Sequence, residues 1–409
     1  MNFLVFLLYI LAYLLIIFRP KTASVTTFLI AISSLIVLNN TNFENIGEIV
    51  DFNTLLILFG MMVIVSVMKE KGVFIGVSNA IIDFSKGNFF KMLVLINVGV
   101  FFLSGFLDNV TTILIFFPIL FYLSDVLNLD SRVLGLNAIL FSNIGGMSTA
   151  IGDPPNIIIY SVSKIPFLDF IANIMPIALI LLIIQLVILR KGIKFEQTSF
   201  QRQERNVVNK NWKYYLLYFI GVIFLMAFHD KFKLELGFIT ILSGLTLLFF
   251  ESEDFNSRIQ DIDWDMLFLI SGLYILNWSI EHTKIFDILV FYLMPLKGSV
   301  ILPLLILWVS IFSSGFIGAL PTTLIFITII KKLTYHMPVS LLYWSLVLGV
   351  GIGGNLTPIA SMCNIIGNNL IRKLKNEYIS FSEFTKNMLK PVLYGAIISS
   401  VFIVFKWYI

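Results

Sequence analysis

Two aspartates lie in parts of the chain that are otherwise apolar. Asp108 falls inside a long apolar stretch, 92–127, and Asp153 directly precedes a pair of prolines. If these stretches cross a bilayer, each carboxylate is costly to bury, so it is a candidate ligand for an ion or a proton. We therefore expect Asp108, with Asp153 near it, to bind a coupling ion, either H+ or Na+.

Helix capping is the structural alternative for both aspartates. Asp108 could accept a hydrogen bond from the backbone N–H of Thr111 and so cap the arm that follows it. Asp153 stands where an N-cap is expected, because proline is tolerated in the first turn of a helix. Capping alone would account for the position of Asp153, so both interpretations remain open there.

Four segments rich in Gly, Pro, Asn and Thr interrupt the apolar stretches. They are 107–112, 143–156, 315–323 and 351–364. In the two longer segments a Gly-Gly pair weakens a helix, and a following proline prevents its immediate resumption. Irregular backbone survives in a bilayer only where protein, water or solute satisfies it. The freed carbonyls could coordinate a cation, and the N-terminus of the resumed helix suits an anion.

The composition indicates a membrane protein. Of 409 residues, 58% are hydrophobic and 13% charged, whereas soluble domains are about 45–50% apolar and about 25% charged. A net charge of +4 is too small to suggest a nucleic-acid partner. One Cys and three His cannot build a disulfide or an ordinary zinc site, and no nucleotide-binding glycine motif is present. We expect no cofactor, no resident metal and no enzymatic activity.

The remaining thiol and imidazoles are expected to be structural. Cys363 invites an arsenite-binding hypothesis, but a lone small residue in a broken helix usually only packs. His229, His282 and His336 fall at the ends of predicted spans. We expect these rings to be solvated or interfacial.

Because a helix needs about 20 apolar residues to cross about 30 Å of hydrocarbon, the apolar stretches predict ten spans. These are 3–18, 23–39, 52–68, 133–151, 167–189, 214–229, 235–250, 265–281, 341–360 and 391–407. Two further stretches, 92–127 and 300–330, are each long enough for two helical arms around a break, so we expect re-entrant hairpins. The segment 73–85 is expected to lie at the membrane interface.

The connector 190–213 carries most of the clustered positive charge and is therefore expected in the cytoplasm. Threading outwards from it puts the N-terminus outside. The hairpin 92–127 then enters from the cytoplasm and the hairpin 300–330 from the opposite side. Lys331 and Lys332 fall on the less favoured side in this arrangement.

An internal repeat relates the two halves. The motif at 51–60 recurs at 263–272, that at 104–112 at 314–322, and that at 144–151 at 352–359, with offsets of 212, 210 and 208. The first copy runs inward and the second outward, so the repeats are inverted, as is typical of secondary transporters.

The resulting fold is an all-α polytopic membrane protein with two inverted repeats, re-entrant hairpins and unwound transmembrane helices. Its parts are N-terminal spans 1–50, repeat 1 at 51–189 with its unwound helix at 133–161, the cytoplasmic linker 190–213, connecting spans 214–262, and repeat 2 at 263–409 with its unwound helix at 341–367.

From about residue 50 to the end, the chain resembles the ion transporter superfamily. The resemblance rests on Leu107-Asp-Asn-Val-Thr-Thr112 followed by Asn143-Ile-Gly-Gly and Ile151-Gly-Asp-Pro-Pro-Asn156. The branch it is most similar to is that of the P protein, alongside arsenical pump membrane proteins, NhaD-type antiporters, and citrate and divalent-anion transporters.

The resemblance and the internal repeat imply a set of ligands for substrate and ion. In the first half these are Asp108, Asn109, Val110, Thr111, Thr112, Asn143, Gly145, Gly146, Thr149, Gly152, Asp153 and Asn156. In the second half they are Pro321, Thr322, Thr323, Gly353, Gly354, Asn355, Thr357 and Asn364.

The second half departs from the family pattern. Several relatives have an Asp-Asn pair at the second tip, whereas this chain has Gly318 and Ala319, and Ser361 stands opposite Asp153. Both site carboxylates therefore come from the first half, which favours one coupling ion over two equivalent sites.

We expect a secondary transporter for a small anion or oxyanion-like solute such as arsenite, coupled to protons or sodium by an elevator-like movement. A sodium/proton antiporter is the alternative, followed by a channel or the membrane subunit of an ATP-driven arsenical pump. The expected partners are lipid, a second copy of the chain, and a separate ATPase subunit. The expected location is the inner membrane of a bacterial or archaeal cell.

Overall fold

The computed structural model describes residues 2–19, 22–42, 47–86, 88–126, 129–192, 211–251, 260–334 and 340–408. Within these residues the protein is helical and contains no strand. Most of the predicted basic linker, 193–210, and His336 lie outside the described residues.

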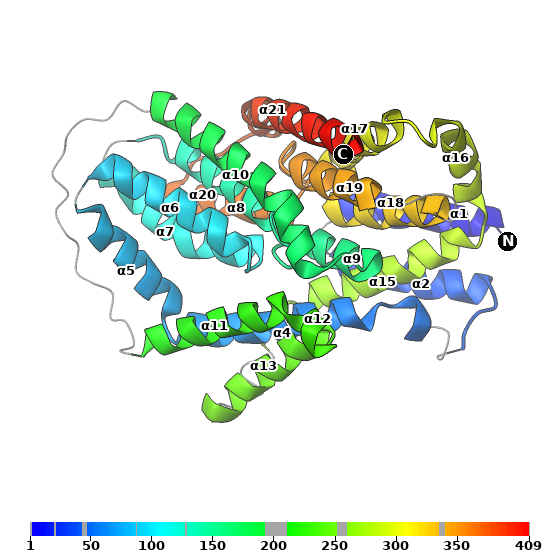
Figure 1. Ribbon diagram of the computed structural model, residues 1–409, viewed down its shortest axis with the longest axis horizontal. Helices are drawn as coiled ribbons and strands as arrows, with labels where there is room; N and C mark the ends of the chain where they lie inside the picture. Colours follow the sequence, from blue (N-terminus) through cyan, green and yellow to red (C-terminus); the bar gives the residue numbers. More distant parts are fainter. Residues whose placement is uncertain are drawn as a thin grey trace.

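Among the residues just given, the first half contains nine helices with assigned bounds (Figure 1). They are α1 (Asn2–Phe18), α2 (Ala23–Val37), α4 (Phe52–Glu70), α5 (Val73–Ser85), α6 (Phe89–Ser104), α7 (Asn109–Val126), α8 (Ser131–Met147), α9 (Pro154–Ser163) and α10 (Phe167–Gly192).

The second half repeats this order with small additions. It contains α11 (Trp212–Ala227), α12 (His229–Phe232), α13 (Leu236–Glu251), α15 (Trp264–Glu281), α16 (Ile285–Leu293), the short 3-10 helix η2 (Met294–Leu296), α17 (Ile301–Ile317), α18 (Ala319–Thr334), α19 (Ser340–Gly353), α20 (Met362–Lys375) and α21 (Phe381–Tyr408).

The contacts between helices repeat as well. The hairpin α6–α7 lies in the left half of the molecule and the hairpin α17–α18 in the right half (Figure 1). Helix α8 packs against α20, and its counterpart α19 packs against α9. Likewise α2 packs against α15, and α13 against α4. The duplicated order thus includes α1 and α2, which match α11 and α13, although the limits of the two repeats stay a prediction.

The repeated aspartates Asp51 and Asp263 begin equivalent helices. Asp51 accepts hydrogen bonds from the backbone N–H groups of Asn53 (3.0 Å) and Thr54 (3.4 Å) at the start of α4. Asp263 accepts one from the backbone N–H of Met266 (2.9 Å) at the start of α15. N-caps of this kind satisfy donors that have no partner inside the helix. The repeated motif therefore marks the start of an equivalent helix in each half.

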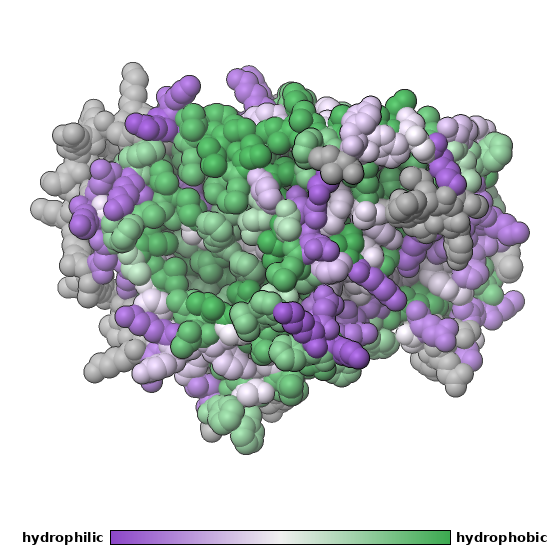
Figure 2. Space-filling view, in the orientation of Figure 1, coloured by the Kyte–Doolittle hydropathy of each residue, from purple (hydrophilic) through white to green (hydrophobic). Residues whose placement is uncertain are grey.

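The outer surface is suited to lipid. Three helices, Phe52–Glu70, Phe167–Lys191 and Phe381–Tyr408, are individually long and apolar enough to cross a membrane, and most of the others are shorter apolar helices. Large apolar side chains such as Phe249 and Val401 are 79% and 65% exposed. Figure 2 shows apolar residues over the middle of one face, with hydrophilic residues at its left edge and over α12. The predicted fold class, an all-α polytopic membrane protein with hairpins and broken helices, is confirmed.

Candidate ion and solute site

The first hairpin turns at Asp108. Helix α6 ends at Ser104 and α7 begins at Asn109. The Oδ1 atom of Asp108 accepts a hydrogen bond from the backbone N–H of Thr111 (2.7 Å), and the carbonyl of Asp108 accepts one from the Thr112 hydroxyl (3.1 Å). The capping role that the sequence offered for Asp108 is therefore present, and it occupies one carboxylate oxygen.

The break between α8 and α9 is stabilised by a single amide. The Nδ2 group of Asn156 donates to the carbonyls of Gly146 (3.2 Å), Met147 (3.0 Å) and Thr149 (2.8 Å). Carbonyls at the end of a helix have no partner within it, so a side chain that reaches back to them compensates for the break. Asn156 is thus a structural element of the unwound stretch.

Thr149 connects this break to the first hairpin. Its hydroxyl donates to the carbonyl of Gly105 and accepts from the backbone N–H groups of Ile151 (3.3 Å) and Gly152 (3.1 Å). The unwound stretch and the hairpin tip are therefore hydrogen-bonded to each other in the same half.

The second half repeats both sets of hydrogen bonds, those of the asparagine side chain and that of the threonine hydroxyl. The Nδ2 group of Asn364 donates to the carbonyls of Gly354 (2.7 Å) and Thr357 (2.8 Å), as Asn156 does in the first half. The Thr357 hydroxyl donates to the carbonyl of Gly315 (2.5 Å), as Thr149 does to Gly105. Duplicated hydrogen bonds at duplicated positions show that the two breaks are the same structure built twice.

Asp153 does not cap α9 with its side chain. It occupies the N-cap position in an extended conformation, with φ −149° and ψ 141°, and makes no side-chain cap hydrogen bond. Its backbone carbonyl accepts from the N–H groups of Asn156 (2.9 Å) and Ile157 (3.2 Å) instead. The capping alternative for Asp153 is therefore wrong, and its carboxylate is oriented by something other than the helix start.

The second tip is built on Gly318. This residue has φ +95° and ends α17, and α18 starts at the next residue. The backbone N–H of Ala319 donates to the carbonyl of Ala360 (3.1 Å), which joins the tip to the second break. The predicted tip residues Pro321, Thr322 and Thr323 lie in the first turns of α18 rather than in irregular backbone.

Two glycines permit close approach between each hairpin and its broken helix. A Cβ atom on Gly145 would lie 2.1 Å from the carbonyl oxygen of Phe101, and one on Gly353 would lie 2.3 Å from that of Ile311. Neither carbonyl belongs to a flexible side chain, so larger residues would force the backbones apart. These glycines serve packing at equivalent positions of the two halves.

A network of amides links the halves. Asn109 donates through Nδ2 to Oδ1 of Asn143 (3.3 Å), and Asn143 donates through Nδ2 to Oδ1 of both Asn355 (3.0 Å) and Asn364 (2.8 Å). The hydroxyl of Ser104 donates to Oδ1 of Asn109. All four asparagines are buried.

Sequence reasoning missed two serines of this network. The hydroxyls of Ser104 and Ser142 are 2.9 Å apart, and that of Ser142 donates to the carbonyl of Asn109 (3.1 Å). Ser104 could have been found from the sequence, because it opens the repeated Ser-Gly-Phe motif that recurs at Ser314. The Ser314 hydroxyl likewise donates to the carbonyl of Val350 (3.0 Å).

Two cavities meet at the aspartates. The larger has a volume of about 860 Å³ and extends between α4, α5 and the first hairpin. The smaller, of about 180 Å³, is lined by both hairpin tips and by the starts of α9 and α20. Asp108 and Asp153 line both cavities. They therefore occupy the boundary between two spaces of different size.

The larger cavity is acidic. Its lining includes one basic residue, Lys69, and five carboxylates. The carboxylates are Asp83, Asp108, Asp153, Asp261 and Asp263. The hydroxyl of Ser66 donates to Asp261 (2.6 Å). Negative potential in a cleft concentrates cations, so this space favours the approach of a cation over that of a free anion.

The predicted site residues divide into two groups. Those that line a cavity are Asp108, Asn109, Val110, Thr111, Gly152, Asp153 and Pro321. Those that lie behind them, outside the lining of both cavities, are Thr112, Asn143, Gly145, Gly146, Thr149, Asn156, Thr322, Thr323, Gly353, Gly354, Asn355, Thr357 and Asn364. A direct role in binding stays a prediction for every member. Several members of the second group, such as Asn156, Thr149 and Gly145, have structural roles that the sequence did not separate from binding.

The expectation of a solvated ring is wrong for His229, which is 6% exposed. Its Nδ1 atom lies 3.0 Å from the carbonyl of Met226, so this nitrogen must carry the proton and donate. Its Nε2 atom lies 2.8 Å from the hydroxyl of Tyr160 in α9 and 3.2 Å from Oδ1 of Asp230. His229 thus connects α12 to the helix that follows Asp153.

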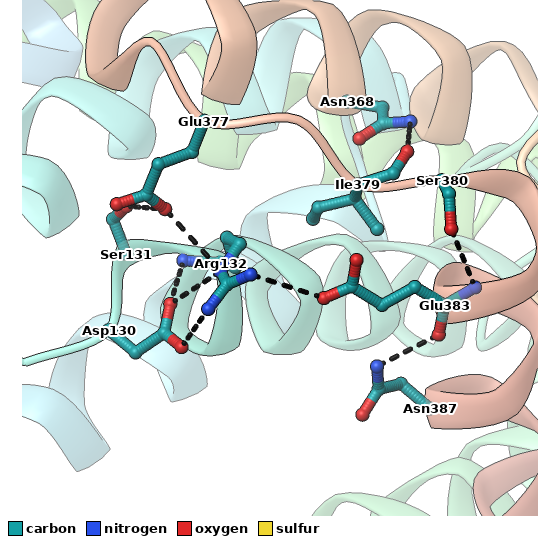
Figure 3. Close-up of polar contacts among 9 residues, drawn as sticks. All are labelled: Asp130, Ser131, Arg132, Asn368, Glu377, Ile379, Ser380, Glu383 and Asn387. Carbon is teal, nitrogen blue, oxygen red and sulfur yellow. Dashed lines mark hydrogen bonds and ion pairs between the residues drawn. The ribbon is translucent and has the colours of Figure 1, made fainter.

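A cluster of charged residues lies at the start of α8, around Arg132 (Figure 3). Arg132 lies 3.0 Å from Asp130, 3.4 Å from Glu383 and 3.7 Å from Glu377. Burial alone would raise the pKa of Asp130, but hydrogen bonds and charge from Arg132 outweigh it and lower that pKa. The cluster joins the start of α8 to the connection between α20 and α21.

The chain is similar to known proteins in both sequence and fold. A family model described as a citrate transporter matches residues 13–349. The chain belongs to the citrate transporter family. Membership of the citrate transporter family identifies the chain as a transporter of the membrane and confirms the resemblance to the ion transporter superfamily.

Individual relatives agree with this assignment. A 46 kDa membrane protein of Mycobacterium leprae is 27% identical over 87% of this chain and 86% of its own length. An uncharacterized transporter of Mycobacterium tuberculosis is 26% identical over 88% and 87%. The P protein of Mus musculus is 27% identical over 91% of this chain, which spans 56% of that longer protein.

The fold has a solved neighbour. The crystal structure of the Alcanivorax borkumensis YdaH transporter, described as having an unusual topology, matches with a TM-score of 0.61. The match covers 91% of this chain and 89% of that chain at 12% identity. At this identity the likeness shows a shared fold.

Proposed function

We propose that the chain is a secondary active transporter that moves a small anion or oxyanion-like solute together with a coupling cation, H+ or Na+. The observation that carries the proposal is that Asp108 and Asp153 line both cavities. A carboxylate that lines both cavities can bind a cation that enters through one cavity and change the affinity for a solute in the other. Coupled transport requires such a link between cation and solute.

Helix geometry supports an anion in the smaller cavity. The first residues of α7, α9, α18 and α20, which are Asn109, Pro154, Ala319 and Met362, all line it. Each helix start carries a partial positive charge of about +0.5. Fewer N–H groups are on offer, because α9 begins with two prolines and the N–H groups of Thr111 and Ala319 are bonded to Asp108 and Ala360. Four such starts around one cavity offer an anion much of the stabilisation that a basic side chain would otherwise provide.

The two aspartates make the cation necessary. An anion in the smaller cavity would lie beside Asp108 and Asp153, and also beside Asp265, which lines the same cavity. Like charges about 4 Å apart repel by about 4 kcal/mol at an effective dielectric constant of 20. Protonation of one carboxylate, or Na+ bound between them, removes this repulsion. Solute binding and cation binding therefore favour each other, and by reciprocity each raises the affinity for the other.

The size and lining of the smaller cavity favour a small, weakly charged solute. Its volume of about 180 Å³ corresponds to about six water molecules, and the residues that line it include no Lys or Arg. Undissociated arsenite or antimonite and small organic or inorganic anions fit these limits better than a fully ionised tricarboxylate. We propose alternating access by an elevator-like displacement of the two hairpins with their broken helices.

Transport by purified protein in liposomes tests the proposal. Uptake of arsenite, phosphate and citrate is compared under separately imposed sodium and proton gradients, with no added anion as the blank. We expect uptake of one solute only when one cation gradient is present. Uptake that is the same with and without both gradients would contradict coupling, and unitary currents in a voltage-clamped bilayer would indicate a channel instead.

A sodium/proton antiporter is the second candidate, because the larger cavity is lined by five carboxylates and a single Lys. On this hypothesis Asp108 and Asp153 exchange the two cations and no anion is carried. Proton movement in everted vesicles on addition of sodium, unaffected by any of the three anions, would decide for it. An inner-membrane location, a homodimer and a separate ATPase subunit remain proposals that native-mass measurement and purification from the native host would test.

A further inference from the structure

The central crossing of the two halves is symmetric in backbone and asymmetric in chemistry. Helices α8 and α19 pack against each other. The repeat offset of 208 pairs Asn143 with Gly351 and Met147 with Asn355. The crossing therefore contains two equivalent contacts, one between Asn143 and Asn355 and the other between Met147 and Gly351.

One of these contacts is polar and the other is apolar. Asn143 donates to Asn355 with a separation of 3.0 Å. On the opposite side, Gly351 packs so closely against Met147 that a Cβ atom would lie 2.6 Å from the Met147 Cβ. The two halves are thus hydrogen-bonded through side chains at one of two equivalent places.

The orientation of the amides in the polar contact is determined by their other partners. Asn355 donates through Nδ2 to the carbonyl of Gly351 (3.1 Å), and Asn364 donates to those of Gly354 and Thr357. Each therefore presents its Oδ1 atom to Asn143. Because Asn143 donates to both and accepts from Asn109, both ends of its side chain are occupied by protein.

The equivalent arrangement does not exist on the other side. Asn156 is the counterpart of Asn364, and the counterpart of Asn143 is Gly351, which has no side chain to donate with. The tip that carries Asp108 is therefore connected through Asn109 and Asn143 to the second break, whereas Gly351 makes no such connection in the reverse direction.

We propose that Asn143 is a positioning residue that couples the ion-binding tip of the first half to the unwound stretch of the second half. This inference rests on the proposed function and deepens it, because it assigns the coupling to one amide and makes Asn143 a connector instead of a ligand. A cation that orders the segment 105–112 also orders 354–361 through Asn143, and this raises the affinity for the solute.

Cation-dependent binding of a probe anion tests this role. Thermal unfolding of the purified full chain is followed against citrate, phosphate and arsenite in sodium chloride or choline chloride, and in acid or alkaline buffer. We expect the cation to lower the half-saturating concentration of one anion by about tenfold in the natural protein. In Asn143→Ala the effect falls to less than about twofold, while the half-saturating concentration without cation stays within about threefold.

Met147→Ala is the matched control, because it removes side-chain volume from the equivalent contact without removing the amide. It should keep the cation effect. Asn355→Ala removes one of the two acceptors of Asn143 and leaves Asn364, so the double variant with Asn143→Ala should lose no more than Asn143→Ala alone. An undiminished cation effect in Asn143→Ala, or an equal loss in Met147→Ala, would overturn the proposal.

Hydrogen exchange separates this inference from the proposed function. Asn143→Ala should speed amide exchange in both 105–112 and 354–361, whereas Met147→Ala should leave at least one of them unchanged. If no anion binds the natural protein in a cation-dependent way, the proposed function fails and exchange alone decides the connection. Unchanged exchange in Asn143→Ala would then show that Asn143 positions neither segment.

Discussion

Replacement of Asp108 by Asn separates the charge of the first tip from its structure. The carboxylate accepts from the backbone N–H of Thr111 at 2.7 Å, and an Asn side chain can accept the same hydrogen bond because Asn and Asp are comparable N-caps. The substitution therefore removes a negative charge and a proton-binding group while it keeps the cap. We expect coupled transport to be lost in a protein that still inserts and folds.

The stability change can be estimated from two opposing effects. Loss of the negative charge at the start of α7 removes about 0.3–1 kcal/mol of favourable interaction with the helix dipole. Loss of a charge at membrane depth relieves a penalty of at most about 2.5–3.5 kcal/mol on insertion scales, and of less than this here because Asp108 is only partly buried and lines two cavities. Asp108→Asn should therefore unfold at the same temperature as the natural protein or a higher one, whereas Asp108→Ala, which also loses the cap, should lose about 1 kcal/mol relative to Asp108→Asn.

Two measurements on the same preparations check this reasoning. Uptake into liposomes under imposed sodium and proton gradients reports coupling, and thermal unfolding in detergent reports the cap. Near-natural uptake by Asp108→Asn would refute the role of the charge. A fall in stability as large as that of Asp108→Ala would refute the claim that Asn replaces the cap.

Three further sets of substitutions are expected to change the stability of the protein. Gly145→Ala and Gly353→Ala should each destabilise the protein by about 3 kcal/mol, measured by thermal unfolding, because the added Cβ meets a backbone carbonyl at 2.1 or 2.3 Å; little change in either would mean that the hairpins separate easily. Thr149→Val and Thr357→Val each leave a buried carbonyl without its hydroxyl donor and should cost about 1–3 kcal/mol. The loss should be larger for Thr149→Val, because it also removes the acceptor of the Ile151 and Gly152 N–H groups. The lowered pKa of Asp130 stabilises the folded state above its unfolded value of about 3.9, and this contribution is lost as the pH falls through the folded pKa. Asp130→Asn should therefore unfold slightly earlier than the natural protein at neutral pH, by less than about 1 kcal/mol, and match it in acid; a difference that persists in acid would contradict this account.

The sequence predicts the breaks and the hairpins well, because their causes are local. A Gly-Gly pair weakens a helix and a following proline prevents its immediate resumption, so the unwound stretches between α8 and α9 and between α19 and α20 can be placed to within a few residues without a structure. Helix α8 nevertheless continues through Gly145 and Gly146 to Met147. The internal repeat adds a second, independent copy of each signal. The helix α5, Val73–Ser85, also coincides with the predicted segment 73–85, because its apolar side and the lysine after it are local signals.

Partners across long sequence separations could not be predicted in this way. Asn143 is bonded to residues 212 and 221 positions away, and His229 to a tyrosine 69 positions away. Which side of a helix faces which neighbour depends on packing of the whole chain, and periodicity in an almost uniformly apolar helix carries little information about it. For the same reason the sequence grouped the residues that line the cavities with the amides and glycines that lie behind them.

The backbone explains why the second tip carries no counterpart of the Asp108 carboxylate. Gly318, the counterpart of Asp108, has φ +95° and ψ 156°, a conformation that is essentially confined to glycine. An aspartate there would be strained even though the nearest side-chain atom to its Cβ would be 3.6 Å away. A carboxylate at position 318 would therefore require a different turn. Thr357 and Asn364, in contrast, make the same hydrogen bonds as their counterparts in the first half. The hydrogen bonds that stabilise a broken helix are therefore separable from the carboxylates beside it. This chain has the hydrogen bonds in both halves, whereas Asp108 and Asp153 have no carboxylate at the equivalent positions of the second half.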